Sequence, residues 1–424
     1  MGKILKKIGA VLMAAALTFG VGAVDVQAAG ATSEGKAKLP SYSTVVNMVI
    51  DPSLSWLRAY GGSGSLEDQL RASILRSDSG SGKNGGIDHN LKVINENPTQ
   101  WFKDRYFKKS MNKFLEAADA NASESVQYKV TFKSGTYTLV DSIKLPSNTC
   151  IDATGCTIKA SQNESEYDGG VFVYNTGSKN IKIVGGTWTT AGQSVDSSNK
   201  DQSVIKFVGV TNLVMQNMKV KSNRWSHIVE VANIKNMTVK GCIFSGNNKD
   251  SDESNPYNEQ PKEAFQLDVD TKDAIGAYSG GTGKGVTDAT FEKCKFVNVG
   301  RGLGSHSGAK TKYTNITVKN CTFKKSLGEG IYAQGWTKST IKGNTISNCK
   351  RAGISSLDSS DLSITKNTVK DVKAYGGKRA KAYAHTAGIY LSAVKNSEIS
   401  GNSLPSPSDG KVFQEPTCSG NTVN

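Results

Sequence analysis

A nine-residue phrase that recurs from residue 180 to the C-terminus constrains the fold of this chain more than any other feature. Each of the first eight copies begins with a polar residue, has an apolar residue three positions later, and ends on a second apolar residue. Repeats of this kind mark solenoids, in which each coil buries its apolar edge only against the neighbouring coils. The copies are Asn180–Trp188, Asn212–Val220, Asn236–Phe244, Asp288–Phe296, Asn315–Phe323, Lys338–Ile346, Asp361–Val369, Asn396–Leu404 and the shorter Pro416–Val423.

The spacing of the copies predicts three short strands in each coil. The apolar residues Val318, Ile341 and Ile364 are 23 positions apart, whereas Val239 and Phe291 are 52 positions apart. The longer interval indicates a loop around 245–262 that projects from the coils, and loops on a rigid scaffold are where binding surfaces are built. One polar slot repeats as asparagine and predicts a side-chain ladder along the stacked coils. Its members are Asn344, Asn367, Asn402 and Asn421.

The part of the chain before the repeat divides into three segments. Residues 1–29 read as an export signal, with lysines at the start, an apolar stretch and a small-residue cleavage pattern at 26–28. Residues 30–97 are a Gly/Ser-rich segment, for which we expect a flexible or surface-laid course. Residues 98–120 carry apolar side chains at helical spacing. We expect an amphipathic helix there that covers the open end of an all-β solenoid, so that the folded domain spans 98–424.

The charge of the chain bears on its partners. The formal charge is +15, and loss of the leader would lower it to +13, because three lysines and one aspartate leave with it. A basic exported protein favours an acidic polysaccharide or cell-wall glycan. No basic stripe with interleaved aromatic residues predicts a nucleic-acid partner, and no second apolar segment predicts stable membrane insertion after signal cleavage. We therefore expect a secreted, extracellular or cell-wall associated monomer.

Four of the seven cysteines fall in positions of the repeat that should face the core. Cys242, Cys294 and Cys321 occupy the same slot of three successive phrases, and Cys418 takes the slot that Ile399 fills one coil earlier. This placement indicates small apolar fillers rather than a disulfide framework, which an odd number of cysteines also disfavours. The chain has no CxxC pair, so a zinc site is not expected.

Another strand precedes each phrase, and these strands align equally well. Their inward column reads Val229, Phe265, Leu303, Ile331, Ile354 and Ile389. Because successive side chains of a strand alternate between its two faces, the next position should point outward. The outward positions read Glu230, Gln266, Gly304, Tyr332, Ser355 and Tyr390, and two residues further on they read Ala232, Asp268, His306, Gln334, Leu357 and Ser392.

Polar side chains also stand two places before the inward column, at His227, Glu263, Arg301 and Glu329. Neighbouring coils lie roughly 4.8 Å apart, so these residues and the outward ones should share a surface patch of the size of a sugar-binding subsite. We expect an indentation in this patch at Gly304. Each member alone is more often a solvated surface residue. Their concentration on adjacent coils, in contrast to the alanines of the last coils, points to a functional site.

The patch could catalyse glycoside hydrolysis, which needs a proton donor and a second carboxylate as base or nucleophile. In this reading Glu263 is the general acid, and Asp268 or Glu230 is the base. The candidate catalytic residues are Glu263, Asp268, Glu230 and His306, and the candidate substrate-binding residues are His227, Gln266, Arg301, Glu329, Tyr332 and Gln334.

β-Elimination of a uronate is the alternative reaction, with a base on the C5 proton and a cation at the sugar carboxylate. Arg301 with His227 or His306 could serve it. The run that contains Asp268, Asp270 and Asp273 could offer oxygens to Ca²⁺, although it lacks the glycine and the final glutamate of an EF-hand loop. Hydrolysis requires no cofactor, whereas the elimination could use calcium. The sequence does not assign any metal ligands.

The segment 135–160 (GTYTLVDSIKLPSNTCIDATGCTIKA) resembles the first coils of the pectate lyase-like right-handed parallel β-helix superfamily, which includes the polygalacturonases. The resemblance covers roughly residues 98–424 and implies a right-handed parallel β-helix. Polygalacturonases carry Asn-Thr-Asp, Asp-Asp and Gly-His-Gly on three successive coils. The segments of this chain that match them are Ser226-His227, Lys262-Glu263 and Gly300-Arg301-Gly302.

One acidic position of that pattern therefore remains, as Glu263, while His227 and Arg301 replace the other two groups. No pectate lyase or pectin methylesterase signature is present either. We expect an exported enzyme that cleaves an acidic polysaccharide, and we favour a hydrolase over a lyase. A non-catalytic glycan-binding or adhesion module and a structural exoprotein are the alternatives.

Overall fold

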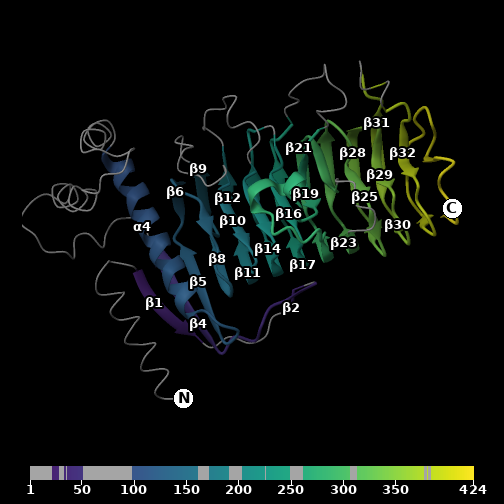
Figure 1. Ribbon diagram of the computed structural model, residues 1–424. Helices are drawn as coiled ribbons and strands as arrows, with labels where there is room; N and C mark the ends of the chain where they lie inside the picture. Colours follow the sequence, from purple (N-terminus) through teal and green to yellow (C-terminus); the bar gives the residue numbers. More distant parts are fainter. Residues whose placement is uncertain are drawn as a thin grey trace, which may run out of the picture.

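The computed structural model describes residues 22–27, 33–34, 36–50, 98–160, 171–190, 203–224, 226–248, 261–305, 313–376, 380 and 383–424. In this part of the chain the backbone winds as a right-handed parallel β-helix, as the repeat and the resemblance predicted. Each coil contributes one strand to each of three sheets, and the coils stack from the capping helix at one end to the C-terminus at the other (Figure 1).

The largest sheet has 14 strands, and all but its first pair run parallel. It contains β1 (Gly22–Gln27), β4 (Thr44–Ile50), β5 (Val126–Phe132), β8 (Thr149–Asp152), β11 (Lys179–Val184), β14 (Thr211–Gln216), β17 (Lys235–Lys240), β20 (Thr287–Glu292), β23 (Tyr313–Lys319), β27 (Thr340–Lys342), β30 (Ser363–Thr365), β33 (Glu398–Ser400) and β35 (Thr422–Val423), with β26 (Trp336–Thr337) beside β23.

The other two large sheets are entirely parallel. The 10-stranded sheet contains β7 (Ile143–Lys144), β10 (Val173–Thr176), β13 (Ile205–Val208), β16 (Val229–Ala232), β19 (Glu263–Asp268), β22 (Arg301–Ser305), β25 (Ile331–Gln334), β29 (Ala352–Leu357), β32 (Ala387–Ser392) and β34 (Val412–Gln414). The 9-stranded sheet contains β6 (Gly135–Leu139), β9 (Cys156–Ala160), β12 (Thr187–Thr189), β15 (Lys219–Lys221), β18 (Ile243–Ser245), β21 (Lys295–Val299), β24 (Thr322–Ser326), β28 (Thr345–Lys350) and β31 (Thr368–Lys373).

The backbone conformation explains why a polar residue opens each phrase. Asn180, Asn212 and Asn236 all have φ of 61°, and Asp288 and Asn315 have φ of 57° and 58°. Asparagine and aspartate tolerate this left-handed conformation better than other residues with a Cβ, because their short side chains bond locally. The amide groups also stack: Asn212 Nδ2 donates to Asn180 Oδ1 at 2.8 Å, and Asn236 Nδ2 donates to Asn212 Oδ1 at 3.0 Å.

The second asparagine ladder is the one that the sequence predicted. Asn344 Nδ2 donates to Asn367 Oδ1, and Asn367 Nδ2 donates to Asn402 Oδ1, both at 2.9 Å. Asn421 stands one coil further and accepts the backbone N–H of Ser397 at 3.0 Å. These bonds satisfy polar groups at the turns, so the slot is structural.

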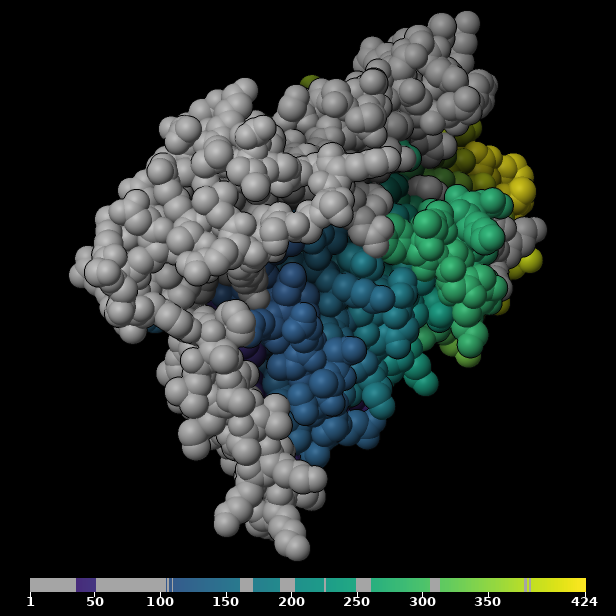
Figure 2. Space-filling model, turned by 60° about the vertical axis from the view of Figure 1, so that its left-hand side comes forward, coloured from purple at the N-terminus to yellow at the C-terminus, as the bar shows by residue number. Residues whose placement is uncertain are grey.

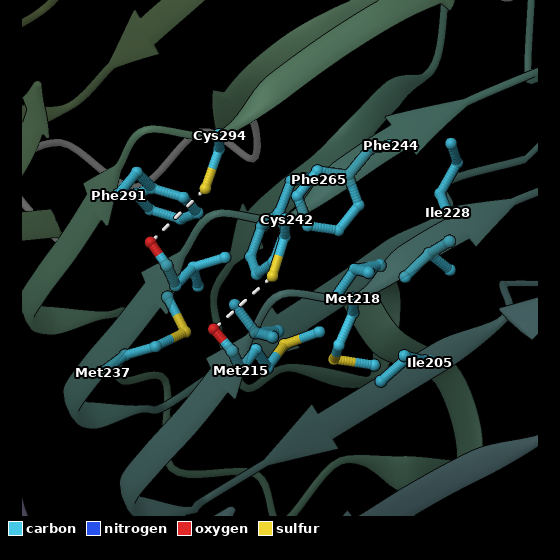
Figure 3. Close-up of a cluster of buried hydrophobic side chains, with 14 of the residues drawn as sticks. Ile205, Met215, Met218, Ile228, Met237, Cys242, Phe244, Phe265, Phe291 and Cys294 are labelled. Atoms are coloured by element: carbon cyan, nitrogen blue, oxygen red, sulfur yellow. Dashed lines mark hydrogen bonds between the residues drawn. The ribbon is translucent and has the colours of Figure 1, made fainter. Parts of the chain in front are cut away.

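The core runs through the centre of the coils and includes the cysteines. Cys242, Cys294 and Cys321 are buried, and all seven cysteines are free thiols, which confirms the filler role. Figure 3 shows Cys242 and Cys294 among methionine and phenylalanine side chains, where their thiols donate to the carbonyl oxygens of Met215 and Val239. The phenylalanines stack from coil to coil in the same way, with the rings of Phe296 and Phe323 4.6 Å apart.

Helix α4 (Pro98–Asn121) closes the N-terminal end of the solenoid, and this confirms the predicted capping helix. Phe107, Met111 and Phe114 are buried on its inner face. The Phe107 ring packs 5.5 Å from Phe132 and 5.1 Å from Tyr137 in the first coil. In Figure 2 the blue side chains of the helix and first coils form one continuous surface. No helix in the described ranges is long and apolar enough to span a membrane.

Parts of the segment 30–97 are more ordered than we expected. Strand β4 alternates buried and half-buried side chains and pairs in parallel with β5, so it adds a strand to the end of the largest sheet. Strand β1, which falls within the expected export signal, pairs antiparallel with β4. Residues 36–39 contain β3 (Ala37–Lys38), which pairs with β2 (Ser33–Glu34) in a short hairpin. They lie across the coils, where the backbone N–H groups of Lys36 and Ala37 donate to Thr238 Oγ1. The stretches 61–65 and 77–86 lie outside the described residues.

Candidate functional site

One outward column crosses the whole 10-stranded sheet. The strand register places Glu230 beside Gln266, Gln266 beside Gly304 and Gly304 beside Tyr332, as predicted from the sequence. The same register extends the column at both ends beyond the predicted coils. In order it reads Lys144, Tyr174, Lys206, Glu230, Gln266, Gly304, Tyr332, Ser355, Tyr390 and Phe413.

A row of charged side chains runs beside this column, at the positions where the chain enters the sheet. Its members alternate in type from coil to coil. His227 Nδ1 lies 3.5 Å from Glu263 Oε2, and Glu263 Oε1 lies 3.2 Å from Arg301 Nη1. Arg301 Nε donates to Glu329 Oε2 at 2.7 Å, and Arg351 Nη1 donates to Glu329 Oε1 at 3.2 Å. We call His227, Glu263, Arg301, Glu329 and Arg351 the charge row.

Glu329 and the two arginines of this row hold one another in the ionised state. Burial alone would raise the pKa of Glu329, but Arg301 and Arg351 outweigh it and hold that pKa below its usual value. Burial would likewise lower the pKa of Arg301, but Glu329 and Glu263 raise it well above its usual value. Such buried pairs are tolerated only when each charge meets a partner of opposite sign. Glu329 is therefore a structural anion and not a proton donor.

Aromatic rings cover the two guanidinium groups. Arg301 Cζ lies 4.2 Å from the centre of the Tyr332 ring, and Arg351 Cζ lies 4.3 Å from that of Tyr390 and 4.7 Å from that of Tyr383. Cation–π contacts of this kind strengthen when the site is desolvated. Burial raises the pKa of Tyr332 to about 12, so its hydroxyl stays protonated at neutral pH.

The predicted patch is not an open surface, which corrects one expectation. Glu230, Gln266, Asp268 and Tyr332 face outward, but each is at most 6% exposed. On the early coils the chain folds back over the sheet after Asp268, through α5 (Lys272–Ile275) and η4 (Gly276–Tyr278). There the Tyr278 ring lies 5.4 Å from Tyr174 and 5.0 Å from Lys206 Nζ. This excursion projects beside the coils in Figure 2, in green.

The candidate carboxylates are engaged with neighbours. Glu230 Oε2 lies 2.7 Å from Lys206 Nζ and accepts from Ser203 Oγ at 3.2 Å. Asp268 accepts from Gln266 Nε2 at 2.5 Å and from the backbone N–H of Val269 at 2.7 Å. An open carboxyl pair with room for a sugar between its members is therefore not formed by these groups. The side chain of Gln334 is half-buried, and its backbone N–H donates to Ser305 Oγ.

The predicted indentation at Gly304 is filled. A Cβ atom at this position would lie 2.8 Å from Glu263 Cγ and 3.2 Å from Tyr332 Cβ. Glu263 thus uses the space that the glycine leaves, and this is how it reaches Arg301. His306 lies outside the described residues, as does most of the predicted loop at 245–262.

The aspartates of the calcium alternative do not converge. Asp270 accepts from Ser279 Oγ at 2.9 Å, from Gly280 N–H at 2.7 Å and from Thr282 Oγ1 at 2.6 Å. Although its burial opposes the charge, these donors hold the pKa of Asp270 below its usual value. Its oxygens therefore organise a loop. In the part of the chain that the structure describes, no group of three or more His, Cys, Asp or Glu side chains could hold a metal ion.

The last coils carry an aromatic group that the sequence reading missed. The ring of His385 stacks on Phe413 with centres 4.0 Å apart, and Tyr390 lies nearly parallel to Phe413 at 5.9 Å. Tyr390 donates to Glu415 Oε1 at 2.8 Å, and His385 Nδ1 lies 3.2 Å from Asp409 Oδ1. We call Tyr383, His385, Tyr390 and Phe413, with Asp409 and Glu415, the aromatic rim. Tyr390 is buried, and the other members of the rim are half-buried.

One signal in the sequence could have revealed part of this rim. Extension of the outward column by one coil in each direction adds Lys206 at one end and Phe413 at the other. Arg351 was missed because it stands one residue before the aligned column, at a left-handed backbone position with φ of 66°.

Comparisons with known proteins agree with this architecture. A family model described as "Right handed beta helix region" matches residues 267–424, and the fold makes the chain a right-handed parallel β-helix protein. No curated protein matches the sequence. PfbA, a surface adhesin of Streptococcus pneumoniae, is similar in structure, with 15% identity, a TM-score of 0.51, and coverage of 76% of this chain and 78% of PfbA.

Two enzymes are more distant neighbours in structure. The A-module of the mannuronan C-5 epimerase AlgE4 of Azotobacter vinelandii has 11% identity and a TM-score of 0.43, and covers 74% of this chain and 95% of the module. An alginate lyase of Paenibacillus sp. has 12% identity and a TM-score of 0.37, and covers 72% of this chain and 96% of the lyase. At these identities the likeness concerns the fold alone.

Proposed function

We propose that this chain is an exported, monomeric glycan-binding protein that holds a sugar chain on the aromatic rim of the 10-stranded sheet. The observation that carries the proposal is the set of nearly parallel rings of His385, Tyr390 and Phe413, flanked by the carboxylates of Asp409 and Glu415. Flat rings can cover the apolar face of a sugar, while carboxylates accept hydrogen bonds from its hydroxyl groups.

The rim is held in place before any ligand arrives. The Tyr390 hydroxyl is tied to Glu415, and the His385 ring is tied to Asp409. Behind them Arg351 contacts the rings of Tyr383 and Tyr390 and is itself fixed by Glu329. A surface that is already ordered loses little conformational entropy on binding. The charge row therefore supports the rim, and its own charges are neutralised internally.

Binding of glycans to the full-length mature chain tests the proposal. In a panel of neutral and acidic oligosaccharides, we expect at least one to bind, and Phe413→Ala to weaken it by roughly tenfold or more, since aromatic anchors dominate such contacts. Tyr278→Ala is the matched control, because it removes a half-buried ring at the other end of the same sheet. Equal affinities for the wild type and both variants, or no binding to any member, would contradict the proposal.

Catalysis is the second candidate, and the contact between His227 and Glu263 favours it. A histidine 3.5 Å from a carboxylate is a pair that can exchange a proton. In this version Glu263, Asp268, Glu230 and His306 act on the glycosidic bond, and His227, Gln266, Arg301, Glu329, Tyr332 and Gln334 bind the substrate.

For hydrolysis, one carboxyl group must break its present ion pair or hydrogen bond; Glu230, for example, must leave Lys206. New reducing ends without unsaturated uronates would indicate hydrolysis, and unsaturated uronates would indicate elimination by Arg301 with a histidine, with or without calcium. Loss of either product in Glu263→Gln, with glycan binding retained, would assign the activity to this group. Binding without any cleavage supports the module.

A further inference from the structure

We propose that the outer face of the 9-stranded sheet is a second binding surface, which takes a linear acidic polysaccharide. This surface is separate from the aromatic rim, and the proposal does not depend on the function assigned to the rim. It rests on the distribution of charge over the three sheets.

The strands of the 9-stranded sheet contain nine lysines and a single acidic residue, Asp371. The side chains of eight of the lysines are exposed, and that of Lys350 is half-buried. The inward positions of the same strands are apolar and buried, for example Val220, Phe296 and Phe323. The lysines are Lys159, Lys219, Lys221, Lys295, Lys324, Lys325, Lys350, Lys370 and Lys373.

The strand register lines up four of these lysines. Lys159, Lys221, Lys324 and Lys370 fall in one column that runs along the axis of the solenoid, with Thr189, Ser245, Val297 and Ser347 between them. At roughly 4.8 Å for each coil, neighbouring lysines of the column are about 10–14 Å apart, and the column is about 34 Å long. A straight row of this length matches an extended polymer better than a small anion.

Within the described ranges, the lysines of this face have no carboxylate partner, whereas some lysines of the largest sheet do. There Lys129 lies 2.9 Å from Asp152, and Lys319 lies 3.6 Å from Glu292. Among the described residues, no carboxylate lies within ion-pair distance of any of the nine. Lys350 and Lys373 even stand directly beside each other in register. Like charges so placed repel one another, so a bound polyanion would relieve the repulsion.

The chemistry of the face favours a polysaccharide over other polyanions. Between its lysines lie threonines, serines and short aliphatic side chains, and no aromatic ring of the described strands is exposed there. Single-stranded nucleic acids need aromatic side chains on which bases stack. A face that binds a membrane needs exposed large apolar side chains to insert. Among the described residues only Val423 is of this kind, and it lies in β35 of the largest sheet.

A pair of charge-matched variants tests the proposal with polygalacturonate as the probe. The face variant combines Lys221→Ser, Lys324→Ser and Lys370→Ser. The control combines Lys235→Ser, Lys240→Ser and Lys342→Ser, which are exposed lysines of the largest sheet. Both lose three positive charges from exposed positions, where substitutions rarely affect folding.

We expect the face variant to bind polygalacturonate roughly tenfold more weakly than the wild type at low salt, and the control to change by less than about twofold. Added salt should weaken the wild-type complex. Equal losses in the two variants would show that net charge alone drives binding and would overturn the proposal, as would no binding to polygalacturonate. Tighter binding to duplex DNA or to phosphatidylserine vesicles, lost in the face variant, would overturn the choice of a polysaccharide.

Discussion

Arg301 and Glu329, on adjacent coils of the 10-stranded sheet, form an ion pair of 2.7 Å in which both side chains are fully buried. Glu263 and Arg351 extend this pair on either side, so that four charges of alternating sign cross four coils. An arrangement of this kind neutralises itself and fixes which coil lies next to which. The same residues support the rings of Tyr332 and Tyr390.

Removal of the central anion should be costly. Glu329→Gln leaves Arg301 and Arg351 buried with one carboxylate fewer between them, so we expect the free energy of unfolding to fall by about 3–5 kcal/mol. Urea unfolding followed by circular dichroism measures this. Glu292→Gln is the control, because its pair with Lys319 is partly exposed and should contribute only about 0–1 kcal/mol. Similar losses in the two variants would contradict the structural role of the charge row.

Acid should weaken the fold through carboxylates whose pKa is lowered. Hydrogen bonds from Thr282 and Ser279 lower the pKa of Asp270 despite its burial, and Arg301 and Arg351 do the same for Glu329. The stability from these groups is present above the unfolded-state pKa values of about 4 and is lost as the pH falls through the lower folded values.

Comparison of the wild type with Asp270→Asn isolates one of these groups. The variant should be less stable by about 1–3 kcal/mol at pH 7, since hydrogen bonds to a charged acceptor are lost. The difference should shrink as the pH falls below about 4. Unfolding midpoints at pH 7, 5, 4 and 3 give the result. A difference that stays constant over this range would show that the charge of Asp270 does not stabilise the fold.

A single methyl group at Gly304 should disturb the site. The added Cβ would lie 2.8 Å from Glu263 Cγ, so Glu263 must move away from Arg301. We expect Gly304→Ala to lower the free energy of unfolding by about 1–3 kcal/mol. Gly376→Ala, where the new Cβ would meet nothing within 4 Å, should change it little. If Gly304→Ala is as stable as Gly376→Ala, then Glu263 does not depend on this space.

The buried cysteines should not react in the native protein. Six of the seven are buried, and burial raises the pKa of Cys349 to about 12, so few thiolates form at neutral pH. We expect a thiol reagent to label at most Cys418 in the native state and all seven in denaturant. Labelling of three or more thiols before unfolding would mean that the core of the coils is accessible.

The repeat made the fold predictable because the coils resemble one another and their register follows from the apolar residues. Val318, Ile341 and Ile364, 23 positions apart, do pair in adjacent coils. The column with Glu230, Gln266 and Tyr332 was predictable for the same reason.

The sequence could not show what covers that column. Its burial depends on segments that break the repeat, such as α5 and η4, and their contacts with Tyr174 and Lys206 follow no period. The pairing of Glu329 with two arginines was hidden for a related reason. Arg351 lies outside the aligned position, at a turn.

The most direct test of the proposed glycan site is a crystal structure of the mature chain with the tightest-binding oligosaccharide of the panel. We expect a sugar ring to lie against Phe413 and His385, with its hydroxyl groups hydrogen-bonded to Asp409 or Glu415. A sugar seated instead over Glu263 and Asp268, with the Lys206–Glu230 or Glu263–Arg301 pair broken, would contradict this expectation and would favour catalysis on the earlier coils.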